Sequence, residues 1–344
     1  MVASIADHAA ILRDNTPVLD VRAPVEYARG SLPNSVNVPL LTDNERAEVG
    51  IRYKQSGNES AVALGYDLVK GSTKHQRIEA WSRFIQSHPD ALVTCWRGGQ
   101  RSAIAQQWLA DIGVEVPRIA GGFKAVRQCS LDVFEQSGSR RWIVIAGSTG
   151  VGKTLLLNDY RESVDLEAIA HHRGSAFGQL DTPQPVPISF ELALAQRLLQ
   201  TQCFPTCLIE DESRTIGRLA LPNALFEAMQ TAPIVVLEAP FEERVTLTYH
   251  QYVHDANPSN LTAALGRIQK RLGFERYSVL ENQLNQAIET KSESRHLIWI
   301  ANLLNWYYDP MYEYQLSRKR ARIVFRGNAE SIREYLADKS QLRS

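Results

Sequence analysis

The chain has 344 residues, and its 38 Lys and Arg balance 38 Asp and Glu, so the formal net charge is zero. Hydrophobic residues make up 44% and charged residues 22%, which excludes a disordered or fibrous protein. This length predicts two domains, at roughly 100 to 200 residues each. No apolar run approaches the roughly 20 residues that cross a bilayer, and the N-terminus lacks the pattern of a signal peptide. We therefore expect a cytoplasmic protein without membrane association.

The first 130 residues alternate short apolar runs with helical patterns. Runs at 17–22, 35–39 and 91–94 are rich in β-forming residues, and helices are expected at 78–87 and 101–112. Strands that alternate with helices predict an α/β fold with a parallel sheet.

A cysteine loop follows the run at 91–94. Cys95 stands where that strand should end, followed by Arg97, Gly98, Gly99 and Arg101. The two glycines allow successive backbone N–H groups to point at one anion, and cationic side chains near a helix N-terminus favour the reactive thiolate. We expect Cys95 to be the catalytic nucleophile and the other four residues to bind an anion. A buried cysteine beside a surface turn is the alternative.

This part of the chain resembles a rhodanese domain in its motifs at 19–27, 30–39 and 121–123 and in its cysteine loop. The resemblance implies that Cys95 carries a chalcogen as a persulfide and that Asp20 and Arg22 shape the site. The spacing from Cys95 to Arg101 is longer than in many small rhodaneses. Phosphatases and arsenate reductases of related fold use it for a tetrahedral oxyanion, but phosphatases have His where this chain has Thr94. The pattern favours chalcogen transfer over dephosphorylation and suits a phosphate-bearing donor such as selenophosphate.

A second anion-binding loop follows a polar stretch at 131–141, which we expect to be a linker. The apolar run at 142–146 leads into a sequence that fits the Walker A pattern at every fixed position, with a helix expected beyond it. In this motif glycines wrap phosphates, the lysine reaches the terminal phosphates and the threonine hydroxyl holds Mg²⁺. The residues expected to bind diphosphate are Gly147, Gly150, Gly152, Lys153 and Thr154.

Acidic residues follow the next strand expected at 206–210. Glu210, Asp211 and Glu212 resemble Walker B acids, and one of them is expected to be linked to Mg²⁺, although position alone does not choose among them. A charged strand end is the alternative. A further strand is expected at 233–238.

The chain has four cysteines, too few and too irregularly spaced for a disulfide framework. Cys203 and Cys207 could form half of a zinc site, but no second Cys or His pair stands nearby. We expect both to be thiols in the core or at a strand edge, and we expect no intrinsic metal site.

Two polar segments have the composition of substrate loops. The first contains His171, His172 and Arg173, and the second contains Ser213 and Arg214.

The chain from about residue 241 is expected to be mostly helical. Residues 260–344 carry 14 Lys and Arg against 9 Asp and Glu. Arg267, Lys270 and Arg271 fall at i, i+3 and i+4, so they share a helix face that could follow an RNA backbone. A solvated basic face is an equally good explanation.

With both halves considered, the chain resembles the tRNA 2-selenouridine synthase family, in which a rhodanese domain is fused to a P-loop domain. The motifs at 171–178, 212–217 and 307–312 carry the resemblance together with the fusion. It implies an enzyme that replaces sulfur by selenium in wobble 2-thiouridine of tRNA. The resemblance further implies a reaction that proceeds through S-geranyl-2-thiouridine, made from geranyl diphosphate, and then uses selenophosphate. The P-loop with Mg²⁺ would then hold geranyl diphosphate rather than ATP, and no organic cofactor is expected.

The expected fold is α/β throughout, with a P-loop NTPase-like parallel sheet in the second half. The expected parts are a rhodanese-like domain at 1–130, the linker at 131–141, a P-loop domain at 142–240 and a helical, tRNA-contacting part at 241–344. Expected partners are tRNA that carries 2-thiouridine and the enzyme that supplies selenophosphate. Two other functions remain open: an ATP-dependent kinase or sulfurtransferase with a rhodanese- or phosphatase-like cysteine site, and a binding protein in which both loops are sensors.

Overall fold

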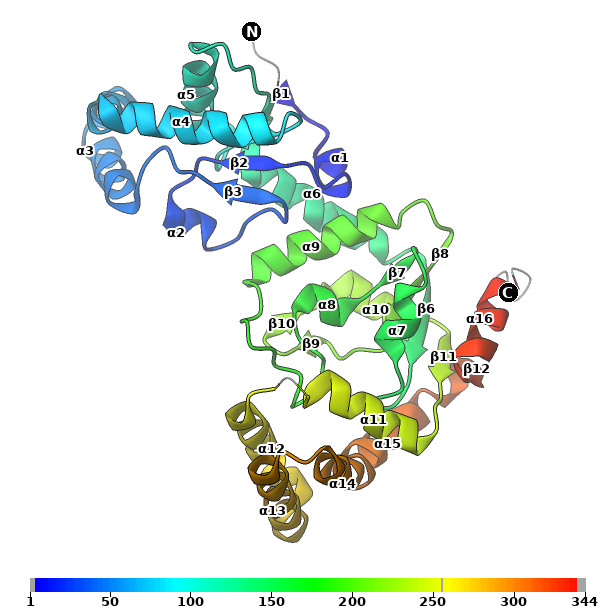
Figure 1. The fold of residues 1–344 in the computed structure, drawn as a ribbon. Helices are drawn as coiled ribbons and strands as arrows, with labels where there is room; N and C mark the ends of the chain where they lie inside the picture. The colour runs from blue at the N-terminus through cyan, green and yellow to red at the C-terminus, as the bar shows by residue number, and fades with distance from the viewer. Residues whose placement is uncertain (1–3, 255, 339–344) are drawn as a thin grey trace. The chain divides into compact units, whose positions relative to one another are not determined.

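The computed structural model describes residues 4–254 and 256–338 (Figure 1). The chain forms two compact units. The first consists of Met1–Glu135 with Val186–Gln200, and the second consists of Gln136–Pro185 with Thr201–Ser344. Among the described residues, no helix is long and apolar enough to cross a membrane.

The first unit is built on a five-stranded parallel sheet in the order β1-β5-β4-β2-β3. Its strands are β1 (Ser4–Ile5), β2 (Val18–Asp20), β3 (Ser35–Asn37), β4 (Leu92–Thr94) and β5 (Arg118–Ile119). Its helices are α1 (His8–Arg13), α2 (Pro24–Tyr27), α3 (Asp43–Leu68), α4 (Ser72–Ser87), α5 (Gln100–Ala110), α6 (Gly122–Ser137) and α9 (Pro187–Gln200). The central strand β4 is fully buried, because helices cover both faces of a parallel sheet.

Helix α3 has a defined start and an internal break. At its N-terminus the Thr42 hydroxyl accepts a hydrogen bond from Glu45 N, and the Glu45 carboxylate accepts one from Thr42 N, which is a capping box. Gly57 has φ +77° and ψ −174°, so α3 consists of two helical segments joined at this residue. Only glycine adopts this conformation readily.

The second unit contains a parallel sheet in the order β12-β11-β6-β8-β7 and a short hairpin. The sheet strands are β6 (Arg141–Ala146), β7 (Ser163–Val164), β8 (Thr206–Glu210), β11 (Ile234–Leu237) and β12 (Ile323–Gly327), and the hairpin is β9 (Thr215–Ile216) with β10 (Leu219–Ala220). The helices that flank the sheet are α7 (Lys153–Asn158), α8 (Leu166–Ala170), α10 (Asn223–Thr231), α11 (Phe241–Tyr252) and α16 (Ala329–Ala337).

A helical subdomain lies between α11 and β12 in the sequence of this unit. It contains α12 (Pro258–Leu272), α13 (Phe274–Thr290), α14 (Glu293–Leu303), the π-helix η1 (Leu304–Tyr308), α15 (Asp309–Arg318) and the 3₁₀ turn η2 (Arg320–Arg322). Leucine, tryptophan and tyrosine side chains from these helices form one buried cluster with α11. A separate cluster packs β6, β8 and β11 against α7 and α16.

The structure confirms the expected α/β class with parallel sheets, and it adds detail to two of the expected parts. The division between the two compact units at Glu135 and Gln136 falls within the linker predicted at 131–141, but most of this stretch is not a loop, because α6 continues to Ser137 and β6 begins at Arg141. Val133 and Phe134 are buried, so an apolar face extends the helix through this polar stretch. The part at 241–344 is mostly helical, as expected, and it also contributes β12, which pairs with β11 and completes the sheet.

Candidate functional site

The strand β4 places Cys95 at its carboxyl end, as the sequence predicts for a parallel sheet. The cysteine side chain is only 3% exposed, and its Sγ lies 3.3 Å from Oγ of Ser102 in the first turn of α5. Ser102 also donates a hydrogen bond to Gly99 O. The hydroxyl therefore ties the sulfur to the start of the helix.

The loop after Cys95 is held against the start of α6. Phe123 N and Lys124 N donate hydrogen bonds of 2.9 Å to the carbonyl oxygens of Cys95 and Trp96. Gly98 has φ +61°, and a Cβ placed on it would lie 2.7 Å from Ile119 O. A larger residue at position 98 would therefore push the loop away from the sheet.

The two arginines of this loop have different surroundings. Arg101 hydrogen-bonds and ion-pairs with Glu26 of α2, whereas Arg97 is exposed. Burial alone would raise the pKa of Glu26, but the hydrogen bonds from Arg101 outweigh it, so the pKa lies below its ordinary value. Arg101 is thereby held as a fixed cation beside Cys95.

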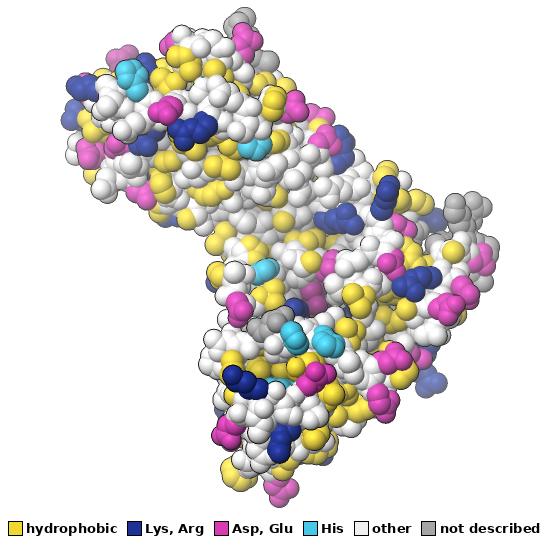
Figure 2. Space-filling model, viewed as in Figure 1, with side chains coloured by type: hydrophobic (Ala, Val, Ile, Leu, Met, Phe, Trp, Pro, Cys, Tyr) yellow, Lys and Arg dark blue, Asp and Glu magenta, His cyan; other side chains and the backbone are white. Residues whose placement is uncertain are grey.

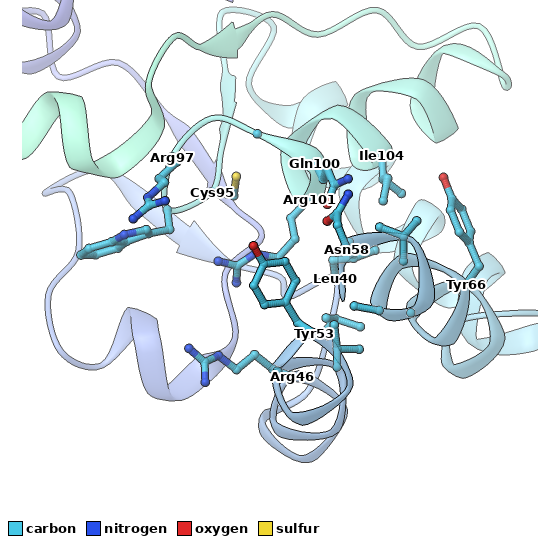
Figure 3. A pocket seen from close by; sticks show the side chains of 18 of the residues that line it. Leu40, Arg46, Tyr53, Asn58, Tyr66, Cys95, Arg97, Gln100, Arg101 and Ile104 are labelled. Carbon is cyan, nitrogen blue, oxygen red and sulfur yellow. The ribbon is translucent and has the colours of Figure 1, made fainter. Parts of the chain in front are cut away.

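A cavity of about 850 Å³ opens beside the cysteine loop (Figure 3). Cys95, Arg97, Gly99 and Arg101 all line it, while Gly98 contributes backbone to the loop without lining the cavity. In Figure 3, Cys95 and Arg97 lie at one end, with Leu40, Ile104 and Tyr66 toward the other.

Asp20 and Arg22 lie beneath this site and are fully buried. Their side chains form an ion pair of 2.6 Å, and Arg22 also donates to Gly30 O. The Arg22 guanidinium lies 3.8 Å from the centre of the Phe123 ring. These contacts fix the start of α6 beneath the cysteine loop and leave neither side chain accessible to a substrate.

The second site is the loop between β6 and α7. Gly150 and Gly152 have φ +81° and +88°. A Cβ on Gly150 would lie 2.5 Å from the backbone oxygen of Arg244, so this position requires glycine. Lys153 Nζ donates to Gly147 O at 2.9 Å, across the loop. All five residues predicted to bind diphosphate line one cavity of about 540 Å³.

The acidic residues at the end of β8, Glu210 to Glu212, have three different environments. Asp211 is bound by Lys319, whose Nζ lies 2.5 and 2.8 Å from its carboxylate oxygens. Glu210 is fully buried and accepts a hydrogen bond from Glu167 N, while its Oε1 has no hydrogen-bond partner among the described residues. Of the three predicted acids, Asp211 and Glu212 line the cavity, and only Glu212 does so without such an ion pair.

The sequence analysis missed a fourth acid, Glu167 of α8. A Cβ on Gly174 would lie 2.6 Å from Glu167 Oε1 and 2.7 Å from Glu212 Oε1, so the two carboxylates meet at this glycine. Burial, together with the negative charges of Glu210 and Glu212, raises the pKa of Glu167 to about 9. Burial likewise raises the pKa of Glu210, to about 8, and that of Glu212.

Arg244 of α11 is a second residue that the sequence analysis missed. Its side chain is 8% exposed, donates to Thr149 O in the P-loop and is paired with both carboxylate oxygens of Asp309. The motif at 307–312 therefore reaches the P-loop through Arg244. The sequence alone does not show that Arg244 is buried or that Asp309 and Thr149 are its partners, so its role could not be predicted from the sequence.

The predicted substrate loops reach the cavity in part. Arg173 and Ser213 line it, whereas His171, His172 and Arg214 do not. His171 contacts the Thr182 hydroxyl, His172 Nδ1 accepts from Gly174 N, and Arg214 donates to Asn223. These three residues shape the loops rather than face the pocket.

The predicted basic face of α12 is divided between two environments. Arg267 donates to Ala176 O at 2.7 Å, and Arg271 donates to the Tyr307 hydroxyl at 3.3 Å. Both line the P-loop cavity, together with Tyr307 and Tyr308 of η1. Lys270 is exposed and does not line the cavity.

The remaining cysteines do not form a cluster with other metal ligands. Cys207 is buried in β8 and contacts Arg140, while Cys203 is exposed. Across residues 4–254 and 256–338, no three His, Cys, Asp or Glu side chains are grouped so that they could hold a metal ion.

Comparisons with known proteins identify both halves. A family model of the tRNA 2-selenouridine synthase AAA domain matches residues 140–343. The chain belongs to the tRNA 2-selenouridine synthase family. It is an enzyme of this type, and the resemblance seen in the sequence is confirmed. A model of the rhodanese-like domain matches residues 4–129.

Full-length relatives agree with this assignment. The tRNA 2-selenouridine synthase of Sulfurovum sp. (strain NBC37-1) is 46% identical over 355 residues, which cover 97% of this chain and 98% of that protein. That of Shewanella loihica (strain ATCC BAA-1088 / PV-4) is 41% identical over 358 residues, with 97% and 96% covered.

Proposed function

We propose that this enzyme replaces sulfur by selenium at C2 of wobble 2-thiouridine in tRNA, in two steps at its two loops. The observation that carries the proposal is that this single chain of the family holds both a cysteine loop with a fixed arginine and a P-loop that lines a separate cavity. Each loop has the features of a site for a phosphate-bearing donor.

In the first step, the P-loop holds geranyl diphosphate. The sulfur of 2-thiouridine attacks C1 of the geranyl group, the C–O bond breaks, diphosphate leaves, and N3 of the base releases its proton to solvent. The residues from Gly147 to Thr154 bind the diphosphate, and Lys153 exchanges its bond to Gly147 O for one to the leaving group. Tyr308 and Met311 provide an apolar part of the cavity wall for the prenyl chain.

Mg²⁺ fits this cavity as a cofactor. Magnesium is commonly bound through one or two carboxylates together with substrate phosphates, so it does not need three protein ligands. Thr154 and the converging carboxylates of Glu167 and Glu212 would hold it, since a cation there would replace the proton that burial places on this pair. When bound, it supplies positive charge that stabilises the departing diphosphate.

In the second step, the thiol of Cys95 assists the transfer of selenium from selenophosphate to C2 of the base. Arg97 and Arg101 hold the phosphate of the donor. Water hydrolyses the P–Se bond to give phosphate, a C2–Se bond forms, the C2–S bond breaks, and the sulfur takes a proton and leaves as geranylthiol. Alkylation in the first step is what makes this sulfur a leaving group. Selenium in selenophosphate is already at the selenide level, so this exchange needs no oxidant.

The tRNA is proposed to contact the basic residues around the P-loop cavity. Arg267 and Arg271 lie at its wall and are positioned for phosphate contacts, and Lys270 adds an exposed charge on the same helix. An interaction between this chain and the enzyme that supplies selenophosphate remains a prediction.

Two variants test the division of labour between the loops. Purified enzyme receives 2-thiouridine tRNA, geranyl diphosphate and selenophosphate, and the nucleosides are identified by mass spectrometry. Lys153→Ala should leave 2-thiouridine unchanged, whereas Cys95→Ala should stop at S-geranyl-2-thiouridine. Geranylation by Lys153→Ala would refute the P-loop assignment. Selenouridine formed by Cys95→Ala at the normal rate would refute the role of the cysteine.

The complete Walker A pattern favours a second candidate function, an ATP-dependent kinase or sulfurtransferase. This candidate predicts nucleotide hydrolysis or transfer in the absence of tRNA. Incubation with ATP and Mg²⁺, followed by measurement of released phosphate with and without tRNA, distinguishes it from diphosphate binding.

A further inference from the structure

The cavity beside Cys95 is much larger than an inorganic oxyanion needs. Its volume of about 850 Å³ lies in the range of pockets that enclose organic ligands, about 300 to 1,000 Å³. Leu40, Val62, Ile104 and Trp108 provide apolar surface in its wall. A site that received only selenophosphate would have no use for this surface.

Helix α3 forms one side of the cavity and leaves it open. Large side chains of this helix, such as Ile51 and Tyr53, line the cavity, and between them Ala47, Gly50, Ala61 and Gly65 contribute side chains that are small or absent. A Cβ built on Gly50 has no atom within 4 Å. At Gly50 the helix therefore leaves space that the packing of this unit does not fill.

The other part of the cavity wall is cationic. Four cations and one anion line it together with Cys95: Arg46, Lys54, Arg97, Arg101 and Glu26, which pairs with Arg101 and Arg46, so the charge of this wall is positive in sum. Figure 3 shows Arg46, Arg97 and Arg101 on the side of the thiol, and Ile104 and Tyr66 beyond Leu40 on the other side. A matching ligand has an apolar chain attached to a polyanion, with the junction between them close to the sulfur.

We propose that this cavity binds the geranyl group of S-geranyl-2-thiouridine tRNA during the second step, as a pocket for the leaving group. This inference rests on the proposed function and adds the ligand of the apolar wall. In the exchange, the P–Se bond is hydrolysed to phosphate and the C2–Se bond forms. The electron pair of the C2–S bond leaves with the geranyl sulfur, which takes a proton, and N3 of the base regains its proton. No atom changes oxidation state.

Selectivity of the pocket for the geranylated nucleoside would set the order of the two steps. Unmodified 2-thiouridine lacks the chain that fills the apolar wall, so the site selects the alkylated nucleoside. Burial of apolar surface contributes about 25 cal/mol per Å², and this selectivity therefore increases with the length of the S-alkyl chain.

Gly50→Phe tests the pocket, with Ala63→Phe as its matched control. Gly50 lines the cavity, has no positive φ, and a Cβ added there meets no atom within 4 Å, so the backbone accepts a side chain whose ring takes up cavity space. Ala63 lies on the same helix, is exposed and does not line the cavity. Thermal melting checks that both variants are folded.

The activity assay compares selenation of tRNA carrying S-geranyl- or S-methyl-2-thiouridine. The wild type and Ala63→Phe should prefer the geranyl substrate by about tenfold or more in kcat/KM. Gly50→Phe should lose this preference through slower reaction of the geranyl substrate, while the methyl substrate reacts as before. Equal loss on both substrates, wild-type rates on the geranyl substrate, or no preference in the wild type overturns the proposal.

Calorimetry with the free nucleoside S-geranyl-2-thiouridine keeps the inference separate from the proposed function. Wild type and Ala63→Phe should bind it, and Gly50→Phe should bind it about tenfold more weakly or not at all. If the wild type selenates neither tRNA, the proposed function fails. The calorimetric affinity for the free nucleoside still tests whether the cavity binds the geranyl group. Equal affinity for all three proteins rejects it.

Discussion

Glu26 holds Arg101 through hydrogen bonds and an ion pair. It accepts from Arg101 and from Ala23 N, so its carboxylate joins α2 to the cysteine loop. Because its pKa lies below the ordinary 4.5 in the folded protein, the pair stabilises the fold above that pH, and the stabilisation is lost as the pH falls through the lowered pKa.

Glu26→Gln should therefore lower the melting temperature of the first unit at pH 7. A loss of about 1 kcal/mol corresponds to about 2–4 °C for a folding unit of roughly 150 to 250 residues. The difference from wild type should shrink as the pH falls below the ordinary carboxyl value. Melting curves between pH 7 and pH 3 measure it. A difference that stays constant with pH would mean that the charge of Glu26 does not matter.

The acids of the P-loop cavity differ in what they can bind. The carboxylate of Asp211 forms an ion pair with Lys319, whereas the carboxylate of Glu212 lies beside that of Glu167 at Gly174. Glu212→Gln should abolish the increase in affinity for inorganic diphosphate that Mg²⁺ produces, whereas Asp211→Asn should retain it. Calorimetric titration of diphosphate with Mg²⁺ or with EDTA measures this. Loss in Asp211→Asn alone would assign the cation to the other acid.

At the scale of elements, α3 depends on its break at Gly57. A side chain there would have to adopt φ +77° with ψ −174°, which costs about 1–3 kcal/mol. Gly57→Ala should therefore destabilise the first unit and speed amide exchange in α3. Gly50→Ala is the control, because it has normal helical space and removes the cost of glycine in a helix, up to about 1 kcal/mol. Equal stability of the two variants would contradict the strain.

Elements that carry a local pattern could be predicted from the sequence. The buried strands before Cys95 and Gly147 were found because a short run of β-formers ends in a glycine loop in each case. Glu167 and Arg244 were missed, because each acquires its importance from partners that are distant in the sequence. Their signal is burial of a charge, which local composition does not show.

The order of the chain also does not follow the two compact units. Helix α9 lies in the sequence between α8 and β8 of the second unit, yet it belongs to the first unit. Gln196 donates to Leu12 O, and Glu191 contacts Arg127. Helical periodicity predicts that α9 exists but not which core receives its apolar face. A boundary drawn from local composition therefore assigns it to the wrong unit.

At the scale of the whole molecule, the C-terminal segment completes the P-loop unit instead of forming an independent helical part. β12 pairs along β11, which itself neighbours the P-loop strand β6, and Ile332 of α16 is fully buried in the same core. Stability of this segment should therefore be coupled to the shape of the diphosphate site.

Ile332→Ala tests that coupling, with Val324→Ala as the control. Ile332 is 0% exposed, so its truncation should cost about 2–5 kcal/mol and weaken diphosphate binding at temperatures near the new melting point. Val324 on β12 is 50% exposed, and its truncation should change stability by less than about 1 kcal/mol. Denaturant unfolding followed with diphosphate present and absent measures both. If Ile332→Ala unfolds the C-terminal segment while the diphosphate site keeps its affinity, the segment is separable from the P-loop unit.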